Sequence, residues 1–242
     1  MSSQRDLSNF EIHRQPDDTT CGPTCLHGVY QYYGQAVALD DLLEQVPTLE
    51  GGGTLGVLLA THALRHGYTV KLITWNIQVF DPTWFDKDAG PLQEKLRRRA
   101  EVKNDARMTR AVNAYVDFLD EGGKIEYHDL EPALLRKYLN RNVPILTGLS
   151  ATFLYRESRE RAEDNQPDDI AGDPAGHFVV LTGYEKGSKQ VEVNDPLYPN
   201  PLAEEHAYLV NIQRLIGAIY LGVLTYDANL IVIEPRKRSS KA

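Results

Sequence analysis

The sequence predicts an α+β fold in which a helical first half and a strand-rich second half form two lobes that face each other across a cleft. Three observations lead to this prediction. Apolar residues recur at helical spacing between Cys21 and Tyr33. Short apolar runs separated by turn residues dominate after Gly123. Helices that precede strands, instead of alternating with them, are typical of α+β folds.

The first half of the chain is predicted to form three helices and one strand. Thr19 and Thr20 are suited to cap the first helix, and Gly34 is suited to end it. Gly51-Gly52-Gly53 lacks the Lys-Ser/Thr pair of a phosphate-binding loop, so we expect a flexible loop near the site. The expected elements are helices at 21–33, 40–45 and 54–65, followed by a strand at 68–75.

A change of character marks residues 81–123, which are highly charged and helix-prone until Gly122-Gly123 stops the pattern. We expect a helical insertion or a continuation of the helical lobe here. The insertion could overhang the active site as a lid, or it could be simple padding, and the sequence does not separate the two.

The second half is expected to supply most of the sheet. Polar and acidic residues fill 156–174, which is predicted to be a mobile loop. Lys186-Gly187-Ser188 is expected to be the turn between two paired strands. The predicted elements are strands at 124–128, 143–149, 178–184 and 190–194, a helix at 130–140, a further helix within 208–221, and the last strands within 222–233.

Composition excludes several classes of function. A net charge of −8 and a pI near 5.4 argue against nucleic acid as the main partner, because phosphate binding needs a basic surface. No stretch approaches the ~18 apolar residues of a membrane span, and residues 1–11 lack an apolar core of secretory length. Two cysteines do not make a disulfide framework. We therefore expect a cytoplasmic protein with free thiols and no membrane partner.

Four residues far apart in the sequence suggest a thiol-dependent acyl-transfer site. Cys21 opens a predicted helix, His177 opens a predicted strand, and Asp195 closes the next strand. A helix N-terminus and a neighbouring imidazolium both favour a thiolate nucleophile. Asp195 would orient the imidazole. Gln15, six residues before Cys21, would add an amide donor for an oxyanion, together with the Cys21 backbone N–H.

These residues carry a resemblance to a known family. Gln15, Cys21-Gly22-Pro23, Tyr32-Tyr33-Gly34, His177-Phe178-Val179-Val180 and Asp195-Pro196 resemble the motifs of papain-like cysteine peptidases. Within that class they most resemble the bacterial double-glycine (bacteriocin-processing) leader peptidases and their stand-alone relatives. Each motif alone is weak, but their order and spacing together make a strong signal.

The resemblance implies a single papain-like domain over 1–242, interrupted at about 81–123. It implies a helical N-terminal lobe, an antiparallel-sheet C-terminal lobe and an active-site cleft between them. By this similarity Cys21 is the nucleophile, His177 the base and acid, Asp195 the orienting group and Gln15 the oxyanion donor. The resemblance implies no cofactor and no metal.

Other candidate residues have simpler interpretations. Cys25 lies one turn further along the helix and is expected to be a buried structural residue. His62 and His66 have the spacing of a two-histidine metal pair, but no third ligand is evident, so exposed histidines are expected. Asp17 and Asp18 could shape the cleft entrance and attract a substrate amine, or could be solvated loop acids.

The sequence therefore predicts a bacterial thiol hydrolase that cleaves a peptide or isopeptide amide through a thioester. Two alternatives stay open. An acyl or aminoacyl transferase could use the same triad, with an amine in place of water. A non-catalytic module could use the cleft to bind a peptide. The involvement of a leader peptide or a partner enzyme also stays open.

Overall fold

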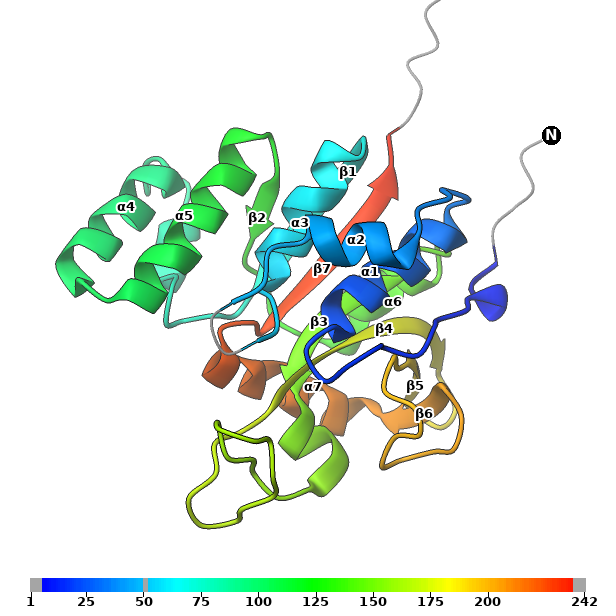
Figure 1. Cartoon of the computed structure of the whole chain (residues 1–242). Coiled ribbons are helices and arrows are strands. Elements are labelled where there is room, and N and C mark those ends of the chain that lie inside the picture. The colour runs from blue at the N-terminus through cyan, green and yellow to red at the C-terminus, as the bar shows by residue number, and fades with distance from the viewer. Residues whose placement is uncertain (1–5, 50–51, 237–242) are drawn as a thin grey trace, which may run out of the picture.

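The computed structural model describes residues 6–49 and 52–236, in which the strands form one seven-stranded sheet (Figure 1). Gly51 of the predicted glycine loop and the first five residues lie outside this part. The strand order is β2-β1-β7-β3-β4-β5-β6. The strands are β1 (Tyr68–Thr74), β2 (Lys124–Glu126), β3 (Ile145–Ser150), β4 (Gly176–Glu185), β5 (Gln190–Asn194), β6 (Ala207–Asn211) and β7 (Asn229–Pro235).

The sheet joins the two halves of the chain. β7, near the C-terminus, lies between β1 and β3 and is antiparallel to both. The strand predicted at 68–75 is therefore an interior strand of the same sheet, next to the edge strand β2. The pairing of β2 with β1 is parallel and departs from the expected antiparallel pattern, because the chain returns through two helices instead of a hairpin.

Helices cover both faces of the sheet (Figure 1). Those of the first large core cluster are α1 (Cys21–Tyr32), α2 (Leu39–Gln45), α3 (Gly56–Arg65), α4 (Leu92–Lys103) and α5 (Ala106–Asp120). Those of the second are α6 (Pro132–Leu139) and α7 (Ile212–Leu221). β4 serves both clusters, since Phe178 and Val180 join the first and Val179 and Leu181 join the second. Burial on both faces explains its continuous apolar run.

Residues 81–123 are helical, as predicted, and consist mainly of the short helix η2 (Pro82–Phe85), α4 and α5. α5 packs on α3, and its side chains Val112, Tyr115 and Phe118 are fully or almost fully buried. The packing of Phe118 requires a glycine at position 123, since a Cβ there would come within 2.4 Å of the Phe118 ring. The segment therefore contributes to the main hydrophobic core.

The predicted elements differ from the structure at two places. The third helix begins at Gly56, and the hydroxyl of Thr54 donates to the carbonyl of Pro47. The helix expected within 208–221 is α7, which Asn211 caps, and the residues before it form strand β6, which was not predicted. Tyr208 and Val210 are buried and alternate with exposed neighbours, which is the period-two pattern of a strand.

Three short helices complete the elements. η1 (Leu7–Asn9) lies near the N-terminus, and η4 (Gly222–Thr225) replaces the first part of the strands expected within 222–233. η3 (Thr152–Arg156), a π-helical turn, follows β3. It is followed by the loop predicted at 156–174, in which Glu160 forms bridges with Pro167 and Asp173.

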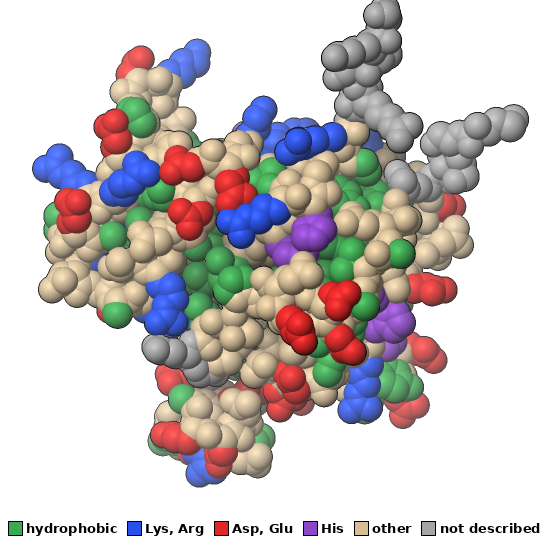
Figure 2. All heavy atoms as spheres, turned by 45° about the horizontal axis from the view of Figure 1, so that its top comes forward, with side chains coloured by type: hydrophobic (Ala, Val, Ile, Leu, Met, Phe, Trp, Pro, Cys, Tyr) green, Lys and Arg blue, Asp and Glu red, His purple; other side chains and the backbone are tan. Residues whose placement is uncertain are grey.

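Charges of both signs are interspersed over the face in Figure 2, without a continuous basic field. That distribution agrees with the negative net charge. Among the described helices, none combines the length and apolar character needed to cross a membrane.

Candidate active site

The packing of α1 on the sheet brings the predicted site residues together. Cys21 is the first residue of α1, which packs on β4. His177 is the second residue of β4. Asp195 directly follows β5, the neighbour of β4 in the sheet. Helix α1 begins at Cys21 as predicted. Thr20, however, does not cap it through its side chain, because its hydroxyl donates to the carbonyl of Asp17.

His177 connects Cys21 with Asp195. Its Nε2 lies 2.7 Å from Asp195 Oδ1. The other ring nitrogen, Nδ1, is left for the hydrogen bond with Cys21. Burial alone would lower the pKa of His177, but the charges of Asp195 and Cys21 outweigh burial and raise that pKa to about 10. The imidazole is therefore held in its protonated form at neutral pH.

Asp195 is fully buried and accepts hydrogen bonds from several donors besides His177. The hydroxyls of Tyr155 and Tyr208 both lie 2.6 Å from Oδ2, and the backbone N–H of Leu197 lies 2.9 Å from Oδ1. Burial would raise the pKa of Asp195, but the charge of His177 and these hydrogen bonds lower it below its ordinary value. The carboxylate is therefore ionised and fixed in orientation.

The two tyrosines were not identified from the sequence. Tyr155 is the last residue but one of η3, a turn that was not predicted. Tyr208 lies on β6, a strand that was not predicted. Both hydroxyls reach Asp195 through tertiary contacts, across 40 residues for Tyr155 and 13 for Tyr208, and such contacts leave no local signal in the sequence.

The loop after Asp195 is locked to its neighbours by backbone contacts. Asp195 N donates to the carbonyl of His206 at 2.9 Å, and His206 Nδ1 lies 2.7 Å from the carbonyl oxygen of Asp195. The next carbonyl, that of Pro196, accepts from the N–H of Gln15 at 2.9 Å. This last bond brings the N-terminal segment to the site.

Gln15 is almost buried, with 7% of its surface exposed. Its Nε2 donates to the carbonyl of Asp17 at 2.9 Å, which uses one of the two N–H groups of the amide. Its Oε1 is buried without a hydrogen-bond partner. Asp17 folds back into its own loop by accepting from the N–H and hydroxyl of Thr19. Asp18 instead faces the cavity described next.

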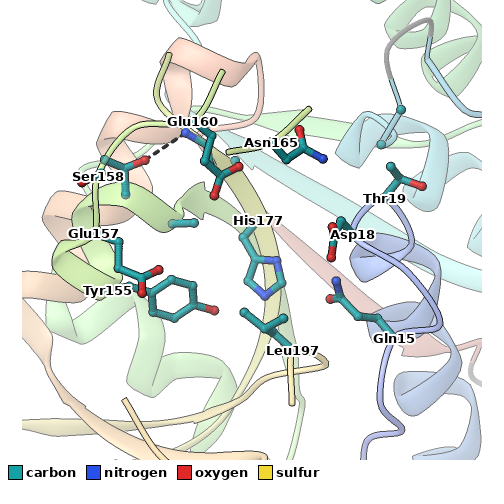
Figure 3. A pocket seen from close by; sticks show the side chains of 16 residues that line it. Gln15, Asp18, Thr19, Tyr155, Glu157, Ser158, Glu160, Asn165, His177 and Leu197 are labelled. Carbon is teal, nitrogen blue, oxygen red and sulfur yellow. Dashed lines mark hydrogen bonds between the residues drawn. The ribbon is translucent and has the colours of Figure 1, made fainter. Parts of the chain in front are cut away.

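A cavity of about 390 Å³ lies beside His177 and Gln15 (Figure 3). Three carboxylates line it: Asp18 from the N-terminal segment, and Glu157 and Glu160 from the loop after η3. Burial and the charges of Asp18 and Glu157 raise the pKa of Glu160. The described glycines of the predicted loop, Gly52 and Gly53, also line this cavity, so that loop lies near the site.

A larger cavity of about 890 Å³ adjoins the first and shares four lining residues with it: Gly52, Glu160, Asn165 and Ala175. The start of α5 forms its other wall through residues that include Arg107 and Ala111. Arg107 stacks on Tyr226 at 4.4 Å. The helical segment 81–123 therefore borders space continuous with the candidate site.

The remaining candidates have structural environments. Cys25 is fully buried, as predicted, and its Sγ donates to the carbonyl of Phe178 at 3.2 Å. The prediction of exposed histidines was wrong for His62, which is buried because its ring nitrogens contact the Tyr30 hydroxyl and the Gln45 side chain. Across residues 6–49 and 52–236, no group of three or more His, Cys, Asp or Glu side chains could hold a metal ion.

The family is decided by a comparison with known protein families. The model of the Peptidase_C39 like family matches residues 7–214. The chain belongs to this family. The matched region includes all four predicted site residues, and the protein is a papain-like cysteine peptidase.

One solved structure shows the same fold at low sequence identity, and two further structures resemble this chain more weakly. A putative C39-like peptidase from Bacillus anthracis has a TM-score of 0.50 and 15% identity, with 96% of this chain and 98% of that chain covered. Xylellain, a cysteine protease from Xylella fastidiosa, has a TM-score of 0.47 and 12% identity, with 96% of this chain and 85% of that chain covered. A double glycine motif protease from an AMS/PCAT transporter, in complex with the leader peptide, has a TM-score of 0.45 and 13% identity, with 96% of each chain covered. No curated protein matches this peptidase.

Proposed function

We propose that this peptidase hydrolyses a peptide or isopeptide amide through a thioester on Cys21. The supporting observation is the buried hydrogen-bonded chain from Cys21 through His177 to Asp195. The Cys21 thiolate attacks the carbonyl carbon, and His177 then gives its proton to the leaving amine as the C–N bond breaks. Water attacks the thioester while His177 takes its proton, and the acid is released as the C–S bond breaks and the thiolate–imidazolium pair is restored.

Asp195 acts on His177 alone. A carboxylate on Nε2 keeps the proton-transferring Nδ1 directed at the thiol and stabilises the imidazolium. The donors Tyr155, Tyr208 and Leu197 hold that carboxylate in place. Since every one of these groups is fixed by the fold, little reorganisation is needed when the reaction begins.

Gln15 and the start of α1 supply the oxyanion site in this proposal. The first N–H groups of a helix have no intrahelical partner, so the N–H of Cys21 can donate to a developing oxyanion. The second N–H of the Gln15 amide is the other donor, because Asp17 takes only the first. Loss of one such donor typically costs about 2.7–4 kcal/mol of transition-state stabilisation.

Alkylation by iodoacetamide, followed by intact mass across pH, tests the proposal in wild type, Cys21→Ala, Cys25→Ala and His177→Ala. We expect one rapid alkylation below pH 7, absent in Cys21→Ala, retained in Cys25→Ala and slowed in His177→Ala. If Cys21 reacts only like an ordinary thiol with pKa near ~8.5, the catalytic assignment fails. The peptide-binding interpretation then replaces it.

A second assay separates hydrolysis from acyl transfer. The protein is incubated with a peptide mixture, with and without an added primary amine, and products are weighed by mass spectrometry. Hydrolysis gives a free acid in both mixtures. A product that carries the amine in place of water would identify a transferase with the same residues.

A further inference from the structure

A pocket of about 380 Å³ lies outside the candidate active site, where the end of η3 meets β6 and the start of α7. We propose that it binds a small organic anion that carries a carboxylate or phosphate group. Two arginines line it, and no acidic side chain does. Its lining residues, here called the Arg156–Arg214 pocket, are Arg156, Leu202, Tyr208, Leu209, Val210, Asn211 and Arg214.

Arg214 carries the argument. Its Nε and Nη2 are buried and have no hydrogen-bond partner. Buried donors are almost always paired, so an unpaired guanidinium edge points to a ligand that the protein alone does not supply. Burial and the neighbouring charge of Arg156 lower the pKa of Arg214, and an anion would relieve both effects.

Arg156 lines the same pocket as Arg214 and has an unfavourable backbone conformation. Its φ of 61° lies in the left-handed region, which residues other than glycine seldom adopt. Such conformations persist where the surrounding structure enforces them, and ligand clamps are one such place. η3 packs closely on α7: a Cβ at Gly217 on α7 would lie only 2.9 Å from the ring of Phe153 on η3. Both arginines therefore project from packed elements.

The class of ligand follows from the lining. A guanidinium edge offers two parallel N–H groups, which match the two oxygens of a carboxylate or phosphate. Leu202, Leu209 and Val210 add an apolar wall, which suits a short hydrocarbon body on the anion. In a protein with a net charge of −8, two adjacent arginines without a lining acid are a local exception.

The pocket is connected to the candidate active site through two tyrosines. Tyr208 lines the pocket, and Tyr155 directly precedes Arg156. Both hydroxyls donate to Asp195 Oδ2. An anion that fixes Arg156 and Arg214 would therefore also fix the donors that orient Asp195. This coupling rests on the proposed role of Asp195, whereas the binding site does not.

Thermal unfolding of the whole chain tests the binding site. Sodium acetate, sodium butyrate and inorganic phosphate are titrated at constant ionic strength against sodium chloride. We expect a saturable rise of Tm in wild type, because a ligand that binds only the folded state stabilises it. In Arg214→Met and Arg156→Met the apparent affinity should fall about tenfold or more. Arg98→Met, at an exposed position on α4, is the matched control and should respond like wild type.

The anion-free proteins give a second readout. Arg214→Met removes a half-buried guanidinium with two unpaired N–H groups and keeps an apolar stem of similar length, so its Tm without added anion should rise above that of wild type. If Arg214→Met does not fold, Arg156→Met, at an exposed position, still tests the loss of affinity. Tighter binding of butyrate than of phosphate would identify a carboxylate ligand, and the reverse ranking a phosphate ligand.

Two results would overturn the proposal. The Tm could rise equally with chloride, or Arg214→Met and Arg156→Met could both keep the wild-type response. Either result would mean an adventitious ion only. The alkylation rate of Cys21, measured with and without saturating anion, then tests the coupling separately. An unchanged rate would remove the link to Asp195 while the binding site stands.

Discussion

Cys21 and Cys25 lie one turn apart on the same helix, yet their surroundings differ in every respect that controls thiol chemistry. Cys21 stands in the first turn of α1, keeps 8% of its surface exposed and shares a hydrogen bond with His177. Cys25 stands in the second turn, is fully buried, and donates a hydrogen bond to the carbonyl of Phe178. Burial raises the pKa of Cys25 well above its ordinary value.

The comparison shows how position along one helix separates a reactive thiol from an inert one. The N-terminal turn of a helix offers free N–H groups and a positive dipole end, which favour an anion. One turn later those N–H groups are paired, and the Cys25 sulfur lies in the hydrophobic core with the carbonyl of Phe178 as its hydrogen-bond acceptor. Cysteine reactivity here is a property of the environment, as is general for buried and active-site thiols.

The largest expected effect is the difference in kcat/KM between the Cys21 and Cys25 variants. Cys21→Ala should lower kcat/KM about 10⁴-fold or more, because no other group can form the thioester. Cys25→Ala should stay within about threefold of wild type, since its thiol donates to the carbonyl of Phe178 and not to a residue of the triad. Both are measured on the same cleaved peptide. Equal losses in the two variants would contradict the assignment of Cys21 as nucleophile.

Asp195→Asn should lower kcat/KM about 10²–10⁴-fold, because the amide cannot stabilise the imidazolium as a carboxylate does. Circular dichroism should show an intact fold, since the asparagine can keep the hydrogen bond with Leu197. The neighbouring Asn194 bonds Thr182 instead, so Asn194→Ala is the matched control and should affect kcat/KM far less. An Asp195→Asn variant as active as wild type would exclude Asp195 from the site.

The pH dependence follows from His177. Its pKa of about 10 means that the imidazolium needed by the leaving amine is lost as the pH rises through that value. kcat/KM should therefore fall about tenfold per pH unit above pH 10, and the fall should begin at lower pH in Asp195→Asn. The free energy of unfolding should also fall as the pH rises. The pKa is raised on folding, so its stabilisation is complete below about 6.5 and is lost as the pH rises through about 10. An alkaline limb near pH 7 in the wild type would contradict the buried ion pair.

The tyrosines give a smaller effect. Tyr155→Phe and Tyr208→Phe each remove one donor from the buried Asp195 carboxylate, and a hydrogen bond to a charged group contributes about 1.5–3 kcal/mol. We expect each variant to lose about tenfold in kcat with little change in KM, because neither hydroxyl is expected to touch substrate. The double variant should lose less than the product of the two, since both donate to the same oxygen. A change confined to KM would show that they bind substrate instead.

The sequence located the ends of most elements, but not the contacts between them. Cys21, His177 and Asp195, three residues of the candidate site, each stand at or next to the end of an element, and such ends show in the sequence as turns and apolar runs. Tyr155 and the Arg156–Arg214 pocket could not be predicted, because they depend on contacts between η3, β6 and α7, which are distant in the sequence. Strand β6 was not predicted either. Its five residues are too few to separate period two from period 3.6 beside a long apolar helix.

The smallest effect concerns stability alone and sharpens the contrast between the two thiols. Cys25→Ala should reduce the free energy of unfolding by about 1–3 kcal/mol, because it leaves a small cavity and a buried carbonyl of Phe178 without its donor. The urea m-value should stay unchanged, since the surface exposed on unfolding is the same. Cys25→Ser keeps a donor at this position and should recover part of the loss. If Cys25→Ala unfolded at the wild-type urea midpoint while its catalysis fell, Cys25 would belong to the chemistry, and the division of roles along α1 would have to be abandoned.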